Sequence, residues 1–374
     1  MDAFKWRWIE SASYAILIAL FYSIAASQAI QSFSYKWTTI AVHKQYSLDK
    51  VFEGTAPKPY AYRILIPSVI NGVIDYAPDH WLLPILKRSK NTLSATIGIE
   101  SEKINDKIAT SYGLTLLLDF FLLVFTLFTL RELTKKILSI GGALNKLIAD
   151  VAPILFALML SISYRVYNGF VYDHFELFAL SAYVLFSWEK RWGPSIFILA
   201  LAILNKETAI FFPLFGLAIS YARNQDYQPK NDGWKFLAEF VVVIVGFVFV
   251  RYLLRNHPGG SVEWHAIGNL DFWLSTTPLS AMTTPHLQVI PLPKPTNIII
   301  FLPIFYSIFG FWIKKPSVVK ITLLLSACIN LPLFFIFSYR DEFRNLSLMF
   351  PFLYLATTHT VLEHYKNIHD GNVT

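Results

Sequence analysis

The sequence predicts an all-α protein that crosses a membrane about ten times. Of its 374 residues, 55% are hydrophobic, 16% are aromatic and only 15% are charged. Soluble domains are normally less apolar and carry more charge. Apolar runs long enough to cross a bilayer recur along the whole chain, and lysines and arginines gather between them, as the topology of membrane proteins requires. These observations predict one polytopic integral-membrane domain over residues 1–374.

The predicted spans come from the apolar runs themselves, because a spanning helix needs about 20 mostly apolar residues. Such runs begin near Ala12, Ser111, Val151, Phe175, Pro194, Glu207, Phe236, Asn297, Val319 and Asn345. The first run is too long for a signal-peptide core and no small-residue cleavage site follows it, so it predicts a retained helix. The runs at Pro194 and Glu207 are short and meet at "NKE". They predict two short spans, one interrupted helix or a pair of half-helices.

Positive charge predicts the orientation of these spans, since short cytoplasmic loops carry an excess of lysine and arginine. If the N-terminus is cytoplasmic, basic segments such as "RELTKK", "WEKRW" and "IKKPSVVK" all lie on the cytoplasmic side. We therefore expect both termini to be cytoplasmic. The net charge of +7 follows from this pattern, and we expect no nucleic-acid partner.

Two long segments are predicted on the opposite, extracytoplasmic side, at residues 31–110 and 255–296. The first contains "PYAYRILIPSVINGVIDYAP". Its apolar stretch is too short and too closely bounded by proline to span comfortably, which favours an interfacial or re-entrant helix.

Charged residues within apolar surroundings mark the candidate site. Lys206 and Glu207 are adjacent in "ILNKETAIFF". Helix neighbours pair at spacings of three or four, so these two cannot neutralise each other and each needs another partner. With the predicted topology, "NKET", "YDHFE" and "YRDEFRN" share the extracytoplasmic face. Their convergence around an outward-facing polar cavity is one interpretation, and separate side chains that extend to lipid head groups are the other.

Asp119, in "LLLDFFLL", lies still deeper in its apolar run. It is interpreted either as a helix-packing hydrogen bond or as a carboxylate in the wall of a cavity. The single cysteine, Cys328, and the scattered histidines show no metal-ligand spacing. Motifs of soluble enzymes, such as a P-loop or GxSxG, are absent from the sequence.

Four patches, "PKPYAYRILIP", "YDHFEL", "NKETAIFFP" and "DEFRNLSLMFP", resemble bacterial GT-C-fold glycosyltransferases, as does the order of a first helix, a large outer loop and many spans. The resemblance implies an enzyme of the bacterial cytoplasmic membrane. It would move a sugar from a polyprenyl-phosphate-linked donor to a lipid-linked glycan or another acceptor on the extracytoplasmic face. Membrane lipids are the other expected partners.

The resemblance and the chemistry of transfer together predict roles for individual residues. A carboxylate must accept the proton of the acceptor hydroxyl, and cations must stabilise the departing lipid phosphate. The family usually has an acidic residue or pair early in the first outer loop, as base or metal ligand, where this chain has only separated carboxylates. A divalent metal is compatible with this pattern, but the metal requirement stays undetermined. The candidates are Asp49, Glu53, Asp173 and Glu207 for catalysis; Arg63, Lys206, Arg340 and Arg344 for the donor phosphate; and Tyr60, Tyr62, Tyr172, His174 and Glu176 for the substrate.

Two other function classes stay open at this stage. A lipid or glycan transporter or flippase would also place charges beside broken helices, although no inverted repeat is visible in the sequence. A non-catalytic membrane subunit would use the large outer segments for docking.

Overall fold

The computed structural model describes most of the chain, in stretches separated by short gaps. The described residues are 3–40, 48–97, 100–139, 142–166, 170–223, 229–260, 264–274, 279–280, 292–293, 298–340 and 342–369.

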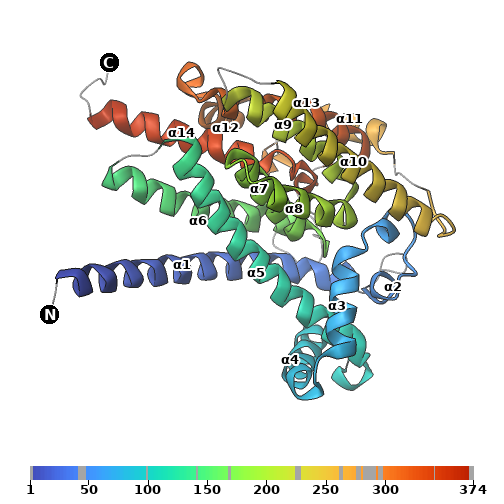
Figure 1. Ribbon diagram of the computed structural model, residues 1–374. Coiled ribbons are helices and arrows are strands. Elements are labelled where there is room, and N and C mark those ends of the chain that lie inside the picture. The colour runs from blue at the N-terminus through green and yellow to red at the C-terminus, as the bar shows by residue number, and fades with distance from the viewer. Residues whose placement is uncertain are drawn as a thin grey trace.

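Helices make up nearly all of the described structure (Figure 1). The α-helices are α1 (Ala3–Ile40), α2 (Leu48–Phe52), α3 (Leu65–Tyr76), α4 (Asp79–Ile97), α5 (Asp106–Ile137), α6 (Ala143–Val166), α7 (Asp173–Trp188), α8 (Trp192–Asn205), α9 (Phe212–Arg223), α10 (Pro229–Leu253), α11 (Ala266–Leu274), α12 (Ile298–Phe309), α13 (Ser317–Phe337) and α14 (Phe350–His369). Short 3₁₀ helices are η1 (Tyr60–Tyr62), η2 (Ser101–Lys103), η3 (Glu207–Phe211), η4 (Trp312–Lys314) and η5 (Phe343–Leu346). Two short strands, β1 (Leu279–Ser280) and β2 (Leu292–Pro293), pair antiparallel. The prediction of an all-α protein is confirmed at this level.

Five helices in the described parts of the chain are long and apolar enough to cross a membrane. This finding agrees with an integral membrane protein, while the total of about ten spans stays a prediction. Shorter apolar helices occur at Leu65–Tyr76, Trp192–Asn205 and Leu302–Lys314. The five candidate spans are Ala12–Ser34, Asp106–Ile137, Asn145–Tyr164, Gly233–Leu253 and Ser317–Phe337.

The "NKE" motif interrupts the helical path, as one of the sequence interpretations predicted. Helix α8 ends at Asn205, and the backbone of Lys206 is extended, with φ −158° and ψ 140°. The 3₁₀ helix η3 starts at Glu207, and α9 follows from Phe212. Pro213 lies in the first turn of α9, where its missing N–H leaves no helical acceptor without a donor. The two apolar runs therefore form two short helices joined at a break.

The first long segment, predicted as an outer loop from Gln31, is largely helical in the structure. Helix α1 continues to Ile40, and α2, η1, α3, α4 and η2 follow before α5. Helix α3 has 12 residues, fewer than a span needs. Figure 1 shows it running across the direction of α1, as expected for an interfacial helix. Of the second segment, 255–296, α11 is well defined, whereas residues 261–263, 275–278, 281–291 and 294–296 lie outside the described residues.

Helix α7 is the central element of the fold. It packs against α5, α8, α9 and α14, and 12 of its 16 residues are buried. Tyr183 and Phe212 pack with their ring centroids 5.6 Å apart, and Phe215 packs on Phe352 at 5.0 Å. Because α7 is surrounded by other helices, the polar side chains in its first turn are held inside the protein.

The two ends of the bundle carry different polar groups. At one end, Lys136 binds Glu189, Arg223 donates to the carbonyl oxygen of Trp188, and Lys235 lies 3.4 Å from the Ser187 hydroxyl. These residues belong to the connections predicted to be cytoplasmic. Helix α1 begins and α14 ends at the same end of the molecule (Figure 1). The first turn of α7 and the "NKET" segment lie at the other end, called the site end below.

Labelling from outside the cell tests which end is extracytoplasmic. In a Cys328→Ser background, Asn256→Cys is expected to react with a membrane-impermeant maleimide and Gly193→Cys is not. Both native residues are exposed, so accessibility to water does not separate them. If Gly193→Cys reacts and Asn256→Cys does not, the predicted orientation is wrong and the other end of the molecule is extracytoplasmic.

Candidate functional site

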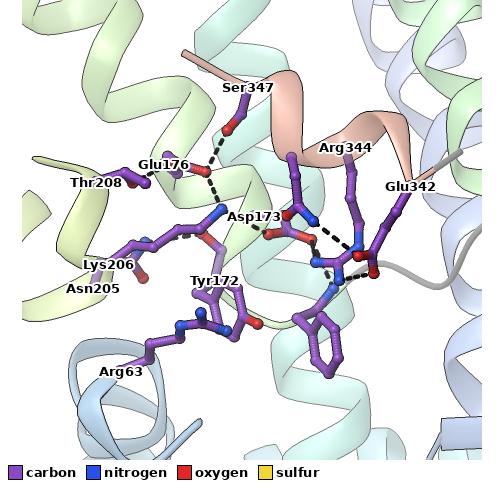
Figure 2. A network of polar contacts seen from close by, with 12 residues as sticks. Arg63, Tyr172, Asp173, Glu176, Asn205, Lys206, Thr208, Glu342, Arg344 and Ser347 are labelled. Atoms are coloured by element: carbon purple, nitrogen blue, oxygen red, sulfur yellow. Dashed lines mark hydrogen bonds and ion pairs between the residues drawn. The ribbon is translucent and has the colours of Figure 1, made fainter. Parts of the chain in front are cut away.

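Charged side chains from three distant parts of the chain meet at the site end (Figure 2). Asp173 and Glu176 come from the first turn of α7, Lys206 from the break between α8 and η3, and Arg344 from η5. All four are buried, with between 2% and 6% of each residue exposed. We call these four residues the buried network. Their positions favour the predicted convergence over separate side chains in lipid head groups.

Lys206 is the cation that joins the broken helix to α7. Its Nζ lies 2.6 Å from Glu176 Oε2 and 3.6 Å from Asp173 Oδ1. The extended backbone at Lys206 ends α8, so the side chain leaves the helix at the level where α7 begins. The preceding Asn205 fixes the same junction, because its Nδ2 donates to the carbonyl oxygen of Tyr172 over 2.9 Å.

Glu176 also accepts hydrogen bonds from two hydroxyl groups. Thr208 donates to Oε1, and Ser347 donates to Oε2 over 2.7 Å. Charge-assisted hydrogen bonds of this kind are among the stronger ones in proteins. Thr208 and Ser347 were not assigned a role from the sequence, although Thr208 lies in "NKET" and Ser347 in "DEFRNLSLMFP". A hydroxyl group beside a charged motif is the signal that could have identified each of them.

Arg344 holds the other carboxylate of the network. Its Nη1 donates to Asp173 Oδ2 over 3.0 Å, and its Nη2 binds Glu342. The backbone N–H of Phe170 donates to the same oxygen of Asp173 over 2.8 Å. The guanidinium carbon of Arg344 also lies 4.3 Å from the centroid of the Phe170 ring, a favourable cation–π distance.

The buried network is electrically balanced, since two carboxylates face two cations. Burial raises the pKa of Asp173, but Arg344, Lys206 and the Phe170 N–H outweigh it and hold the pKa below its ordinary value. Burial lowers the pKa of Arg344, and Glu342 and Asp173 raise it by more, so the guanidinium stays charged. Glu342 adds a third carboxylate at the edge of this set, where its side chain is 15% exposed.

A second pair, Arg63 and Glu207, lies at the rim of the site and is held less tightly. Arg63 Nε is 3.5 Å from Glu207 Oε2, and the side chains are 14% and 26% exposed. The guanidinium of Arg63 lies 4.0 Å from the Tyr172 ring centroid. Phe170 and Tyr172 stack 5.4 Å apart with nearly parallel planes. The rim therefore combines a cation, a carboxylate and flat aromatic surfaces.

The adjacent positions of Lys206 and Glu207 predicted that each has a separate partner, and the structure agrees. The two residues do not pair with each other, since Lys206 binds Glu176 and Glu207 binds Arg63.

Other predicted site residues lie elsewhere. Tyr62 contacts Arg251, whose guanidinium is 4.1 Å from its ring centroid. Arg340 is exposed, and its backbone N–H donates to Asn269 on α11. The predicted phosphate contact at Arg340 would thus come from outside the buried network. Tyr60 remains near the rim, with its ring centroid 5.3 Å from that of Phe170.

The early carboxylates and His174 are also placed apart from the network. Asp49 is on α2 and Glu53 directly follows that helix. The contacts found among the described residues connect neither of them to the buried network. His174 is 1% exposed and faces Asp119 on α5 instead of the rim. Within the described part of the chain, no cluster of three or more His, Cys, Asp or Glu side chains is suited to hold a metal ion.

Comparison of the chain with protein-family models, with curated proteins and with solved structures found no match.

Proposed function

We propose that this protein is a membrane glycosyltransferase of GT-C-like design with about ten spans. It transfers a sugar from a polyprenyl-phosphate-linked donor to an acceptor on the extracytoplasmic face. The observation that supports this proposal is the position of Arg63 and Glu207, a partly exposed cation and carboxylate joined by one long contact beside the buried network. An acid–base group and a phosphate-binding group are needed side by side for this reaction.

In the proposed reaction, Glu207 accepts the proton of the acceptor hydroxyl. The hydroxyl oxygen bonds to the anomeric carbon of the sugar, the bond from that carbon to the phosphate oxygen breaks, and its electron pair leaves with the lipid phosphate. Arg63 binds the charge that gathers on this phosphate, because a guanidinium suits a two-pronged contact with phosphate oxygens. Tyr60 is partly exposed and offers its ring to the sugar, whereas Tyr172 is buried and supports the guanidinium of Arg63.

The buried network has a supporting role in this proposal. Lys206 and Arg344 already bind carboxylates at 2.6 Å and 3.0 Å, so a donor phosphate would have to compete with Glu176 and Asp173 for them. Lys206 immediately precedes Glu207, and its contacts with α7 hold the start of η3 in place. Precise placement of the base next to the phosphate site follows, which is what catalysis requires.

A carrier for lipid-linked glycans is the second candidate, favoured by the helix break at Lys206. Broken helices with charged residues at the break are typical of secondary transporters. The four residues of the buried network carry two charges of each sign and bind one another through short contacts, which fits a fixed support better than a site that must release its cargo. A non-catalytic subunit would need neither the helix break nor the buried network.

Turnover of a lipid-linked donor separates these candidates. Purified protein in lipid nanodiscs is incubated with polyprenyl-phosphate-linked sugars that carry a radioactive sugar. A transferase is expected to release free polyprenyl phosphate and to label an added lipid-linked acceptor. A carrier would leave the donor intact and move it between leaflets of a proteoliposome. Absence of both results would contradict the transferase and the carrier alike and favour the accessory subunit.

A further inference from the structure

A buried acid–base pair lies between α5 and α7, next to the buried network, and has no part in the proposed transfer. Asp119 is in the middle of α5 and His174 is in the first turn of α7. The His174 Nδ1 is 3.3 Å from Asp119 Oδ2, and both side chains are 0% exposed. His174 directly follows Asp173, so the pair is one residue away from the buried network.

The hydrogen-bonding capacity of this pair is not satisfied by the groups around it. Among the described residues, neither oxygen of Asp119 and neither ring nitrogen of His174 has a hydrogen-bond partner with adequate geometry. The imidazole is instead enclosed by aromatic rings, with centroid distances of 4.6 Å to Phe33 and 5.0 Å to Tyr164. Buried polar atoms without hydrogen bonds are uncommon in proteins, and each one calls for an explanation.

The charge states open to such a pair are few. With one proton, it is either a carboxylic acid beside a neutral imidazole or a carboxylate beside an imidazolium, and both forms have zero net charge. With no proton it carries −1, and with two protons it carries +1. A net charge in a dry, apolar environment is costly unless a neighbour compensates it. A proton added to or removed from either residue therefore changes the net charge of the pair as a whole.

Charged neighbours are available on the side of the buried network. Asp173 lies within electrostatic range of Asp119. The Tyr164 ring, which packs on His174, lies within range of both the pair and the network. Asp173 on α7 acts on Asp119 directly, and Tyr164 on α6 packs on His174. Glu176 on α7 and Arg344 on η5 lie within electrostatic range of Tyr164, and Lys206 lies within range of Asp173.

We propose that Asp119 and His174 form a proton-binding site inside the bundle, and that the proton it holds is coupled to the charge on Asp173. The negative charge of Asp173 favours the protonated, neutral form of the pair, and the neutral pair in turn places no second negative charge beside Asp173. This inference does not depend on the proposed sugar transfer.

Infrared spectra of the purified protein in nanodiscs, recorded over a series of pH values, test the proposal directly. In the wild-type protein we expect the carboxylic-acid C=O band of Asp119, or the imidazolium bands of His174, to change with pH. The Asp119→Asn variant keeps the shape of the side chain and is expected to lose this change. The Asp75→Asn variant, at an exposed aspartate on α3, is the matched control and is expected to keep it.

A second variant protects the test against loss of folding. Asp119→Glu retains a carboxyl group, so the band is expected to persist at a shifted frequency. Spectra of Asp119→Asn and Asp119→Glu that both match the wild type at every pH would overturn the proton-binding site.

The coupling to Asp173 has its own measurement. Removing the negative charge with Asp173→Asn is expected to lower the midpoint of the pair's titration by about one pH unit, because a nearby carboxylate favours proton binding. Glu176→Gln tests the same effect with the same sign if Asp173→Asn does not yield folded protein. An unchanged midpoint would overturn the coupling.

Discussion

Replacing Arg344 with methionine is expected to lower the free energy of unfolding by about 3–5 kcal/mol, the usual cost of removing one partner from a buried ion pair. The change leaves Asp173 buried, with a backbone N–H at 2.8 Å and Lys206 at 3.6 Å as its remaining partners. Most of the cost is thus the penalty of a poorly compensated carboxylate. Chemical unfolding in detergent micelles measures the difference.

Two further variants supply a control for the loss of an arginine and test whether the unpaired charge of Asp173 causes the loss of stability. Arg340→Met removes an exposed arginine from the same connection and is expected to change the free energy of unfolding by less than about 0.5 kcal/mol. The double variant Asp173→Asn with Arg344→Met removes both charges and is expected to recover much of the loss, since no charge is left unpaired. Equal stability of Arg344→Met and Arg340→Met would contradict a tightly packed network.

The Glu207→Gln variant is expected to slow sugar transfer by about a hundredfold to ten-thousandfold, the usual contribution of a general base. Glutamine keeps the size of the side chain and removes its ability to accept the proton. The Arg63–Glu207 contact is long and partly exposed, so its loss is expected to cost at most about 1 kcal/mol of stability. Release of polyprenyl phosphate under saturating donor measures the rate.

Glu102→Gln is the matched control for this variant, because Glu102 is an exposed glutamate in the predicted outer segment 31–110. It is expected to keep the wild-type rate. If Glu207→Gln also keeps that rate while Asp49→Asn or Glu53→Gln loses it, the catalytic base belongs to the first outer segment instead. That outcome would show that the acceptor hydroxyl is deprotonated away from Arg63, and it would leave the description of the fold and of the buried network unchanged.

Several features of the site could be predicted because they depend on neighbours in the sequence. The break at "NKE" follows from two short apolar runs that meet at a pair of charges. Adjacent positions on a helix point in different directions, so Lys206 and Glu207 had to find separate partners. The clusters "YDHFE" and "YRDEFRN" were expected at the same end as "NKET" because each connects spans on that side.

The identity of each partner could not be predicted in this way. Arg63 and Glu207 are separated by 144 positions, and Arg344 and Asp173 by 171. Many other charged residues lie in segments predicted to be extracytoplasmic, and the sequence gives no reason to prefer one of them as a partner over another. Asp119 illustrates the limit, since its position in an apolar run marked it as unusual, but its neighbour His174 was assigned to the substrate.

By itself, the sequence determined that the chain is helical, suited to a membrane and interrupted at Lys206. These properties follow from the transfer free energy and spacing of residues close together in the chain. Only the tertiary structure decided that Asp173, Glu176, Lys206 and Arg344 form one buried network, while Arg63 and Glu207 remain at its rim. The reason is physical, because the energy of a charge pair depends on the distance and burial of its atoms, and packing of the helices around α7 sets both.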